Sequence, residues 1–377
     1  MRFVLSIILL VVLSCKEKNA ALSNDQDIEL MNQTVTYATG FSIKTYDGYK
    51  EIKLNNPWPD AQQELTYILY TTEAKKPKYS PNITFIKIPV QHVVVTSTTD
   101  IPMLELLEKE QTLVGFPNTD YITSEKTRKL ISNGNIKELG NERSINTELV
   151  LELAPDVVIG FSATGNTKAY DLIQKTGIPT VMNGSWMEKH PLGRAEWIKF
   201  VAAFYGEEQK ARTIFGEIEK AYNNAVESAK KAATSPTILA GSMFKDTWHV
   251  PGGDSYVAKF LKDANTSYLW ADEKMTGSIA LNFESVLEKG QNADFWIGSG
   301  SSKTMDELYQ KNNRYQLFDA FKNKNVYSST LKVGEKGGLL YYELGPMRPD
   351  LILKDIIKIT HAEVLPNYEL YFFKNLN

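Results

Sequence analysis

The order of short valine-rich runs and helical segments constrains the fold of this chain most. The first set of apolar runs has the length of buried parallel strands and lies at 93–95, 112–116, 156–161 and 179–182. Helical patterns separate these runs, at about 101–110, 146–154 and 166–176. Because parallel strands need crossover connections, this alternation predicts a parallel sheet covered by helices.

A second set of strands and helices follows one long helical stretch. Apolar residues three or four apart predict a helix over 195–231, roughly 50 Å long at 1.5 Å per residue, although Gly206 and Gly216 weaken its continuity. The second set predicts strands at 237–243, 294–298 and 325–329, and helices near 254–263, 283–289, 304–322 and 347–361. The chain is therefore predicted to have an α/β fold, with two doubly wound lobes bridged by one long helix.

A small β extension is predicted ahead of the first lobe. Residues 41–46 and 49–54 alternate around an Asp47-Gly48 turn, which indicates a hairpin, and 63–70 adds a further strand. We divide the whole chain as follows: signal peptide 1–15, tether 16–33, β extension 34–83, N-terminal lobe 84–194, linking helix 195–232 and C-terminal lobe 233–377.

The first fifteen residues have the pattern of an export signal. Arg2 precedes an apolar run over 3–13, which is shorter than the about 20 residues of a spanning helix. Val12-Leu13-Ser14-Cys15 resembles the lipobox of bacterial lipoproteins, and Cys15 is the single cysteine of the chain. We therefore expect a lipid on Cys15 and a periplasmic or other extracytoplasmic location in the cell envelope. The alternative is a plain signal peptide whose apolar run ends in cysteine.

Composition excludes several classes of function. The formal net charge is -3 and basic runs are short, which argues against binding to nucleic acid. The sequence has no Gly-x-Ser-x-Gly, His-Glu-x-x-His, phosphate-loop or dinucleotide-binding motif, so no catalytic residue is predicted. The four histidines, at 92, 190, 249 and 361, lack metal-ligand spacing, so no metal site is predicted.

The two predicted lobes contain an internal match. Each copy begins Asn-x-Glu and ends Asp-x-x-Ile-Gly, with Asn146, Glu148, Asp156 and Gly160 in the first lobe and Asn282, Glu284, Asp294 and Gly298 in the second. An asparagine suits a helix N-cap and a glutamate suits the first turn, which accounts for either glutamate alone. Two carboxylates at equivalent places predict, in addition, a matched pair on one surface.

Because of the internal match and the order of the predicted elements, residues 84–362 resemble the iron-chelate and cobalamin family of periplasmic binding proteins. The segment Glu148-Leu-Val-Leu-Glu-Leu-Ala-Pro-Asp-Val-Val-Ile159 fits a phrase typical of that family. The resemblance implies a monomeric receptor without a cofactor, which delivers an iron complex (siderophore or haem) or cobalamin to a dimeric ABC permease. It also implies that Glu148 and Glu284 dock onto permease arginines. An exported lipoprotein enzyme and a chelatase or metallochaperone are the alternatives.

The resemblance further implies a ligand cleft between the lobes, at the carboxyl ends of the strands. The candidate ligand-binding residues are Thr96–Thr99, Phe116, Tyr121, Trp186, Trp248, His249, Trp270, Tyr341, Tyr342 and Arg348. Aromatic faces suit a planar chelate and an arginine suits its anionic edge. Core packing explains each aromatic residue equally well, and an ion pair with Asp350 would explain Arg348. His249 would be an axial ligand if the ligand were haem.

Overall fold

The computed structural model describes residues 31–32, 35–59, 61, 64–78, 83–141 and 144–377. The predicted signal peptide and Cys15 lie outside these residues, as does most of the tether. In the described part of the chain, no helix combines the length and the apolar character needed to cross a bilayer.

The N-terminal lobe is built on a five-stranded parallel sheet in the order β12-β11-β6-β7-β8. Its strands are β6 (Val93–Val95), β7 (Leu113–Phe116), β8 (Lys137–Glu138), β11 (Val157–Gly160) and β12 (Thr180–Met182). Its helices are α1 (Asp100–Leu106), α2 (Glu125–Ser132), α3 (Thr147–Leu153) and α4 (Lys168–Lys175). The four predicted strands are confirmed. The sequence patterns missed β8, because both of its residues are exposed and it has no apolar run.

The C-terminal lobe is also built on a five-stranded sheet, but its strands follow a different order, β16-β13-β18-β19-β20. These are β13 (Thr237–Ala240), β16 (Ser267–Tyr268), β18 (Phe295–Ile297), β19 (Val326–Ser328) and the antiparallel β20 (Lys374–Asn375). The helices are α8 (Tyr256–Asp263), α9 (Phe283–Gly290), α10 (Met305–Lys311), α11 (Asp319–Lys322), α12 (Leu340–Leu344) and α13 (Pro349–Thr360). Two parallel-sheet lobes are therefore confirmed.

A separate antiparallel sheet stands on the C-terminal lobe. It contains β14 (Ser242–Phe244), β15 (Thr247–Pro251) and β17 (Ser278–Leu281). The sequence patterns predicted one strand over 237–243, but the chain turns at Gly241, whose φ is +87°. A Cβ there would lie 2.0 Å from the carbonyl oxygen of His249, so the close approach of β15 requires glycine.

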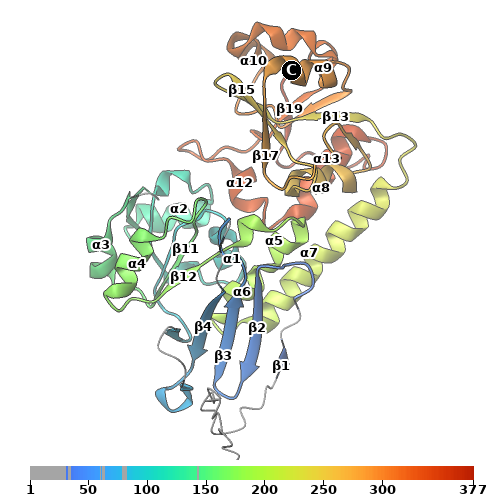
Figure 1. Cartoon of the computed structure of the whole chain (residues 1–377). Helices are drawn as coiled ribbons and strands as arrows, with labels where there is room; N and C mark the ends of the chain where they lie inside the picture. Colours follow the sequence, from blue (N-terminus) through green and yellow to red (C-terminus); the bar gives the residue numbers. More distant parts are fainter. Residues whose placement is uncertain (1–30, 33–34, 60, 62–63, 79–82, 142–143) are drawn as a thin grey trace, which may run out of the picture.

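The predicted long helix between the lobes is confirmed, but it is shorter than the predicted 195–231, and the connection contains three helices. They are α5 (Pro191–Glu196), α6 (Ile198–Ala203) and α7 (Glu208–Ala229), which has 22 residues and is therefore about 33 Å long. The break follows from Gly206, whose φ of +72° is incompatible with a right-handed helix, whereas Gly216 lies inside α7. Figure 1 shows α7 running from the base of the N-terminal lobe to the C-terminal lobe, where it packs on α13.

The β extension forms its own sheet, in the order β1-β2-β3-β4-β5. The strands are β1 (Met31–Asn32), β2 (Phe41–Tyr46), β3 (Tyr49–Leu54), β4 (Leu65–Tyr70) and β5 (Thr84–Lys87), and the predicted hairpin is β2 with β3. Phe41 packs against Trp197 and Phe200 of the helical connection, with ring centroids 4.8 and 5.8 Å apart. The extension therefore shares one core with the connection, although the domain boundaries themselves remain a prediction.

Two buried glutamates bind the chain just before β2. Glu196 accepts hydrogen bonds at 2.7–3.1 Å from the backbone N–H groups of residues 36, 37 and 38, and Lys199 pairs with it at 2.6 Å. Glu188 accepts from the N–H groups of residues 39 and 40, at 2.8–3.0 Å, and from the Trp197 indole at 3.0 Å. Five successive N–H groups thus meet two carboxylates, which compensates the cost of burying these charges.

The pairing of Glu196 predicts a large effect on stability. Glu196→Ala removes the acceptor of three backbone N–H groups and the carboxylate that pairs with Lys199 in a buried site. We expect the free energy of unfolding, measured by urea denaturation, to fall by about 3–5 kcal/mol. Glu227→Ala is the control, because the Glu227–Lys230 pair is exposed on α7 and should change stability by less than about 0.5 kcal/mol. Equal stability of the two variants would contradict the buried role of Glu196.

Candidate functional site

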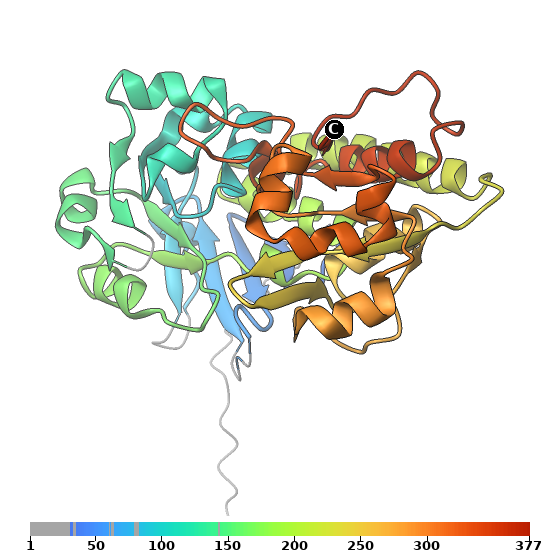
Figure 2. The same cartoon turned by 90° about the horizontal axis from the view of Figure 1, so that it is seen from above.

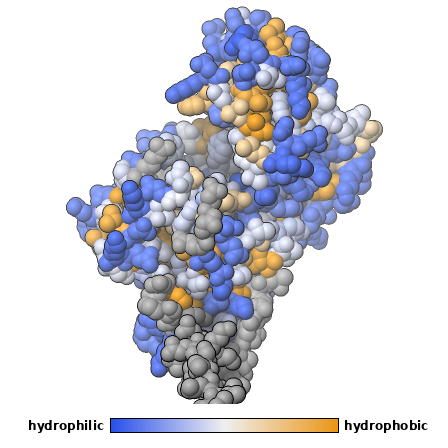
Figure 3. All heavy atoms as spheres, in the orientation of Figure 1, coloured by the Kyte–Doolittle hydropathy of each residue, from blue (hydrophilic) through white to orange (hydrophobic). Residues whose placement is uncertain are grey.

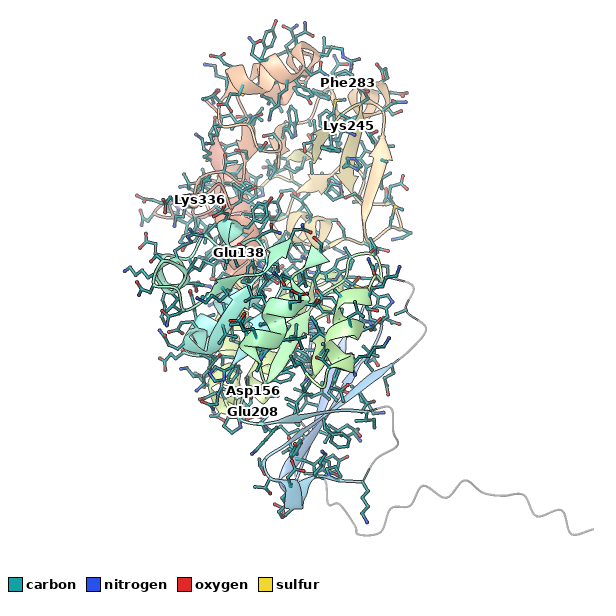
Figure 4. All side chains as sticks on the ribbon, turned by 90° about the vertical axis from the view of Figure 1, so that its left-hand side faces the viewer. Glu138, Asp156, Glu208, Lys245, Phe283 and Lys336 are labelled. Carbon is teal, nitrogen blue, oxygen red and sulfur yellow. The ribbon has the colours of Figure 1, made fainter. Side chains whose placement is uncertain are left out.

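The internal match of the sequence corresponds to equivalent places in the two lobes. Asp156 precedes β11 and accepts from the N–H groups of Gln91 and His92 at 2.7 and 2.9 Å, just before β6. Asp294 precedes β18 and accepts from the N–H and Oγ1 of Thr237 at 2.7 Å, at the start of β13. In both lobes these two strands are parallel neighbours, so each aspartate links the first strand of its lobe to the strand that ends the internal match. Figure 4 labels Asp156 at the lower end of the N-terminal lobe.

The two candidate docking glutamates stand in the first turns of α3 and α9. The Asn146 side chain accepts from the N–H of Leu149 at 3.1 Å, and Asn282 accepts from Ser285 at 2.8 Å, as predicted for helix caps. Glu148 and Glu284 are both exposed. Glu284 also pairs with Arg314 at 2.9 Å, but its side chain is 71% exposed, so the pair is weak. Figure 1 shows α3 and α9 on the outer parts of their lobes, away from α7.

Three of the candidate ligand residues lie in the hydrophobic core. Phe116 is 1% exposed, Trp248 is 0% exposed and Trp270 is buried. Trp248 packs in an aromatic cluster with Trp296 and Phe318, at centroid distances of 5.1 and 5.5 Å. We therefore correct these assignments, because the rings have no face open to a ligand and their packing explains their presence.

Arg348 and His249 also have surroundings that differ from the expected site. Nε and Nη2 of Arg348 donate to the two carboxylate oxygens of Asp350, at 2.8 and 2.9 Å. The ion pair that we considered as the alternative role of Arg348 is therefore present. His249 is exposed on β15, opposite Ser242 of β14 and Ala280 of β17. His249 is thus accessible, whereas the Arg348 guanidinium is already engaged.

Tyr121 and Tyr342 are the most accessible of the aromatic candidates. Tyr121 ends a short turn after β7 in the N-terminal lobe and is 60% exposed. Tyr342 belongs to α12 of the C-terminal lobe and is 61% exposed. Figure 3 shows a recess between the lobes on the side away from α7, with apolar side chains on the C-terminal lobe above it. These two tyrosines can offer rings to a ligand from both lobes.

The segment 331–345 of the C-terminal lobe lies against the N-terminal lobe. Glu343 accepts from the N–H groups of Thr123 and Ser124 at 2.6 and 2.9 Å. A Cβ on Gly338 would lie 2.2 Å from the Tyr121 carbonyl oxygen, so the two backbones are in close contact. Figure 2 shows this segment crossing to the N-terminal lobe, and Figure 4 shows its Lys336 above Glu138. This segment therefore forms a second contact between the lobes, in addition to the helical connection.

The sequence patterns missed a cationic group at the junction of the lobes. Arg194 of α5 donates from Nη2 to the Trp186 carbonyl at 2.7 Å and from Nε to the Glu188 carbonyl at 3.2 Å. Its guanidinium lies 3.7 Å from the ring centroid of Tyr256, at the start of α8 in the other lobe. No sequence pattern indicates Arg194, because residues 191–193 and 195 around it are buried apolar or small residues and its aromatic partner is distant in sequence.

Burial shifts the pKa values of both partners in this contact. Desolvation lowers the pKa of the Arg194 guanidinium, because the charged form loses hydration. Burial also raises the pKa of Tyr256 to about 12, so the phenol keeps its proton near neutral pH. Each group is therefore a hydrogen-bond donor in a poorly hydrated place.

Two other features bear on ligand binding. Within the described residues, no group of three or more His, Cys, Asp or Glu side chains is arranged to hold a metal ion.

A pocket of about 230 Å³ lies between the β2–β3 turn and the end of α6, lined in part by Tyr46, Tyr205 and Gly206. This pocket lies beside the β extension, and none of the candidate ligand residues lines it.

Known proteins resemble this chain in sequence and in fold. An uncharacterized lipoprotein of Methanocaldococcus jannaschii is 27% identical over 311 residues, covering 80% of this chain and 72% of the relative. A possible iron-binding, periplasmic solute-binding protein of Staphylococcus epidermidis superposes with a TM-score of 0.57 at 15% identity, covering 73% of this chain and 100% of that one. The periplasmic haem-binding protein of Vibrio cholerae gives a TM-score of 0.55 at 20% identity, covering 70% and 99%.

A family match spans both lobes and their connection. Residues 93–330 match the family described as "Periplasmic binding protein". The matched region begins at β6, includes α7 and both Asp-x-x-Ile-Gly ends, and ends shortly after β19. Because it covers more than half of the chain, the protein belongs to the periplasmic binding protein family.

Proposed function

We propose that this protein is the substrate-binding lipoprotein of an ABC importer. It captures an iron complex, either a siderophore or haem, or a cobalamin, and delivers it to a dimeric permease. The observation that carries this proposal is the pair of exposed carboxylates, Glu148 and Glu284, at equivalent helix starts in two lobes of a periplasmic binding protein. The protein acts as a monomer and binds its ligand without transforming it.

The named relatives support the class of ligand and the lipid anchor. The Staphylococcus epidermidis protein is described as possibly iron-binding and the Vibrio cholerae protein as haem-binding, which favours a metal chelate as the ligand. The Methanocaldococcus jannaschii relative is named a lipoprotein, which supports lipidation of Cys15 and a place in the cell envelope. A binding role is preferred over an exported enzyme or a chelatase because the family is one of binding proteins.

The chain's own residues suggest how the ligand is held and delivered. Tyr121 and Tyr342 supply aromatic faces from the two lobes, which suits a flat or apolar chelate surface. Glu148 and Glu284 carry negative charge on the outer parts of the lobes, where they attract cationic groups of a partner and set its orientation. Arginines of the permease would suit them, because a guanidinium binds a carboxylate through two parallel hydrogen bonds.

A fluorescence titration tests the ligand. The Cys15→Ala protein, which cannot be lipidated at that position, is titrated with ferric siderophores, haem, cobalamin and free ferric ion. We expect saturable quenching of tryptophan emission by one chelate, with a Kd in the micromolar range or tighter, and none by the free ion. Absence of binding across the panel, together with hydrolytic turnover of a test substrate, would favour the enzyme alternative.

A double variant tests the docking surface. Glu148→Lys with Glu284→Lys places like charges against permease arginines, so uptake of the chelate by cells should fall at least about tenfold. The affinity of the purified variant for the ligand should not change. Loss of that affinity would contradict docking, and so would unimpaired uptake.

The chain offers a closely matched control for this experiment. Glu152 and Glu288 lie on the same two helices, four residues after the docking pair, and both are exposed. Glu152→Lys with Glu288→Lys therefore makes the same change of net charge one helical turn away. We expect this control to retain more uptake than the docking variant, and equal loss in both would indicate attraction by overall charge instead of specific docking.

A further inference from the structure

Residues 331–345 of the C-terminal lobe form an arm that reaches the N-terminal lobe. The base of the arm is fixed to the last residues of the chain, because the N–H of Leu331 donates to the carbonyl of Phe372 at 3.1 Å. A short hairpin follows, in which Val333 pairs with Leu339. Figure 1 shows α12, the last part of the arm, on the side of the C-terminal lobe that faces away from α7. The arm therefore lies on the same side as the recess between the lobes.

Two glycines let the tip of the arm lie directly against the backbone of the N-terminal lobe. A Cβ on Gly338 would lie 2.2 Å from the carbonyl oxygen of Tyr121, and one on Gly334 would lie 3.1 Å from the Cα atom of Thr123. Gly338 is buried in this contact. A larger residue at 338 would have to displace the arm, so the contact depends on the missing side chain at this position.

Glu343 of α12 fixes the arm to the start of α2. Glu343 is 2% exposed, and its carboxylate accepts hydrogen bonds from the N–H groups of Thr123 and Ser124 at 2.6 and 2.9 Å. Both of these residues precede α2, so the i→i−4 hydrogen bonds of that helix do not include their N–H groups. A residue of one lobe thus supplies the acceptor for two donors of the other.

Opposing effects act on this contact. Burial raises the pKa of Glu343 and the N–H groups that it binds lower this pKa, with the loss of hydration the larger effect. The carboxylate of Glu105 raises the pKa further, and it lies nearby because it accepts from the hydroxyl groups of Ser124 and Thr127. The cost of burying the charge offsets part of what the hydrogen bonds contribute, so the contact can break while both lobes stay folded.

We propose that Glu343 is a latch between the lobes, and that the recess opens on the side away from α7 when the two hydrogen bonds of Glu343 break. The helical connection joins the lobes through α7, so a rotation about it separates the arm from α2. Tyr342 and Tyr121, the accessible aromatic candidates of the two lobes, adjoin the latch and move apart with it. The latch governs the access of any ligand to the recess, so this inference goes beyond the proposed function and does not depend on which ligand is bound.

Hydrogen exchange of backbone N–H groups, measured by NMR on the ligand-free Cys15→Ala protein, tests the latch. The N–H groups of Thr123 and Ser124 should be protected although they precede α2. Glu343→Ala should speed their exchange at least about tenfold, because it removes two hydrogen bonds to a charged acceptor. The N–H of Arg128, which bonds to the Ser124 carbonyl at 2.8 Å inside α2, should keep its rate and so show that α2 stays folded. Unprotected N–H groups at 123 and 124 in the parent protein would overturn the latch.

Distances between the lobes test the opening itself. Spin labels are attached to Lys175→Cys in α4 and Gln310→Cys in α10, two exposed positions, in the Cys15→Ala protein, which has no other cysteine. Glu343→Ala should raise the minor population of longer distances at least about tenfold. Gly338→Ala should do the same without a change of charge, because its methyl group would displace the arm from the N-terminal lobe.

Two matched controls accompany these variants. Glu335→Ala removes an exposed carboxylate from the same arm, and Gly277→Ala adds a methyl group where a Cβ meets no atom within 4 Å. Both should keep the distances and exchange rates of the parent protein. If Glu343→Ala speeds exchange but leaves the distances unchanged, Glu343 only caps α2 and the latch is overturned. None of these measurements needs a ligand, so their outcome is independent of the proposed function.

Discussion

The burial of charge in the helical connection is the constraint on which the rest of the structure depends. Glu188 and Glu196 would be costly in an apolar junction, and five successive N–H groups at 36–40, with Lys199 and the Trp197 indole, compensate them. The chain before β2 is thereby fixed, and the β extension packs on α6. The same arrangement occupies both carboxylates, so Arg194 forms no ion pair within the described residues and bonds to two backbone carbonyl groups instead.

The sequence predicted best the elements that are buried on both faces. Val93–Val95 and Val157–Gly160 are entirely buried, and such strands read as continuous apolar runs. The strands β8 and β20 contain two residues each and no buried side chain, so no pattern indicated them. The linking helix was predicted too long because apolar spacing continues through Gly206, where only the backbone conformation ends the helix.

The candidate site was predictable where it repeats and unpredictable where it depends on long-range contact. The paired Asn-x-Glu segments identified Glu148 and Glu284 because the two copies could be compared. In the sequence, a lone tryptophan such as Trp248 looks the same whether it lies in a core or in a cleft. Only the structure shows that Trp248 is buried. Arg194 stands out only through its contact with Tyr256 of the other lobe, and no local sequence pattern links these two residues.

The hydrogen bonds to residues 36–40 have a mechanical consequence if Cys15 is lipidated, as proposed. Traction from the N-terminal side would act first on the pairing of β1 with β2 and then on the five N–H groups at 36–40, which transmit it to Glu188 and Glu196. A pull on the proposed lipid anchor would therefore load the β extension and the connection between the lobes before it loads the sheet of either lobe.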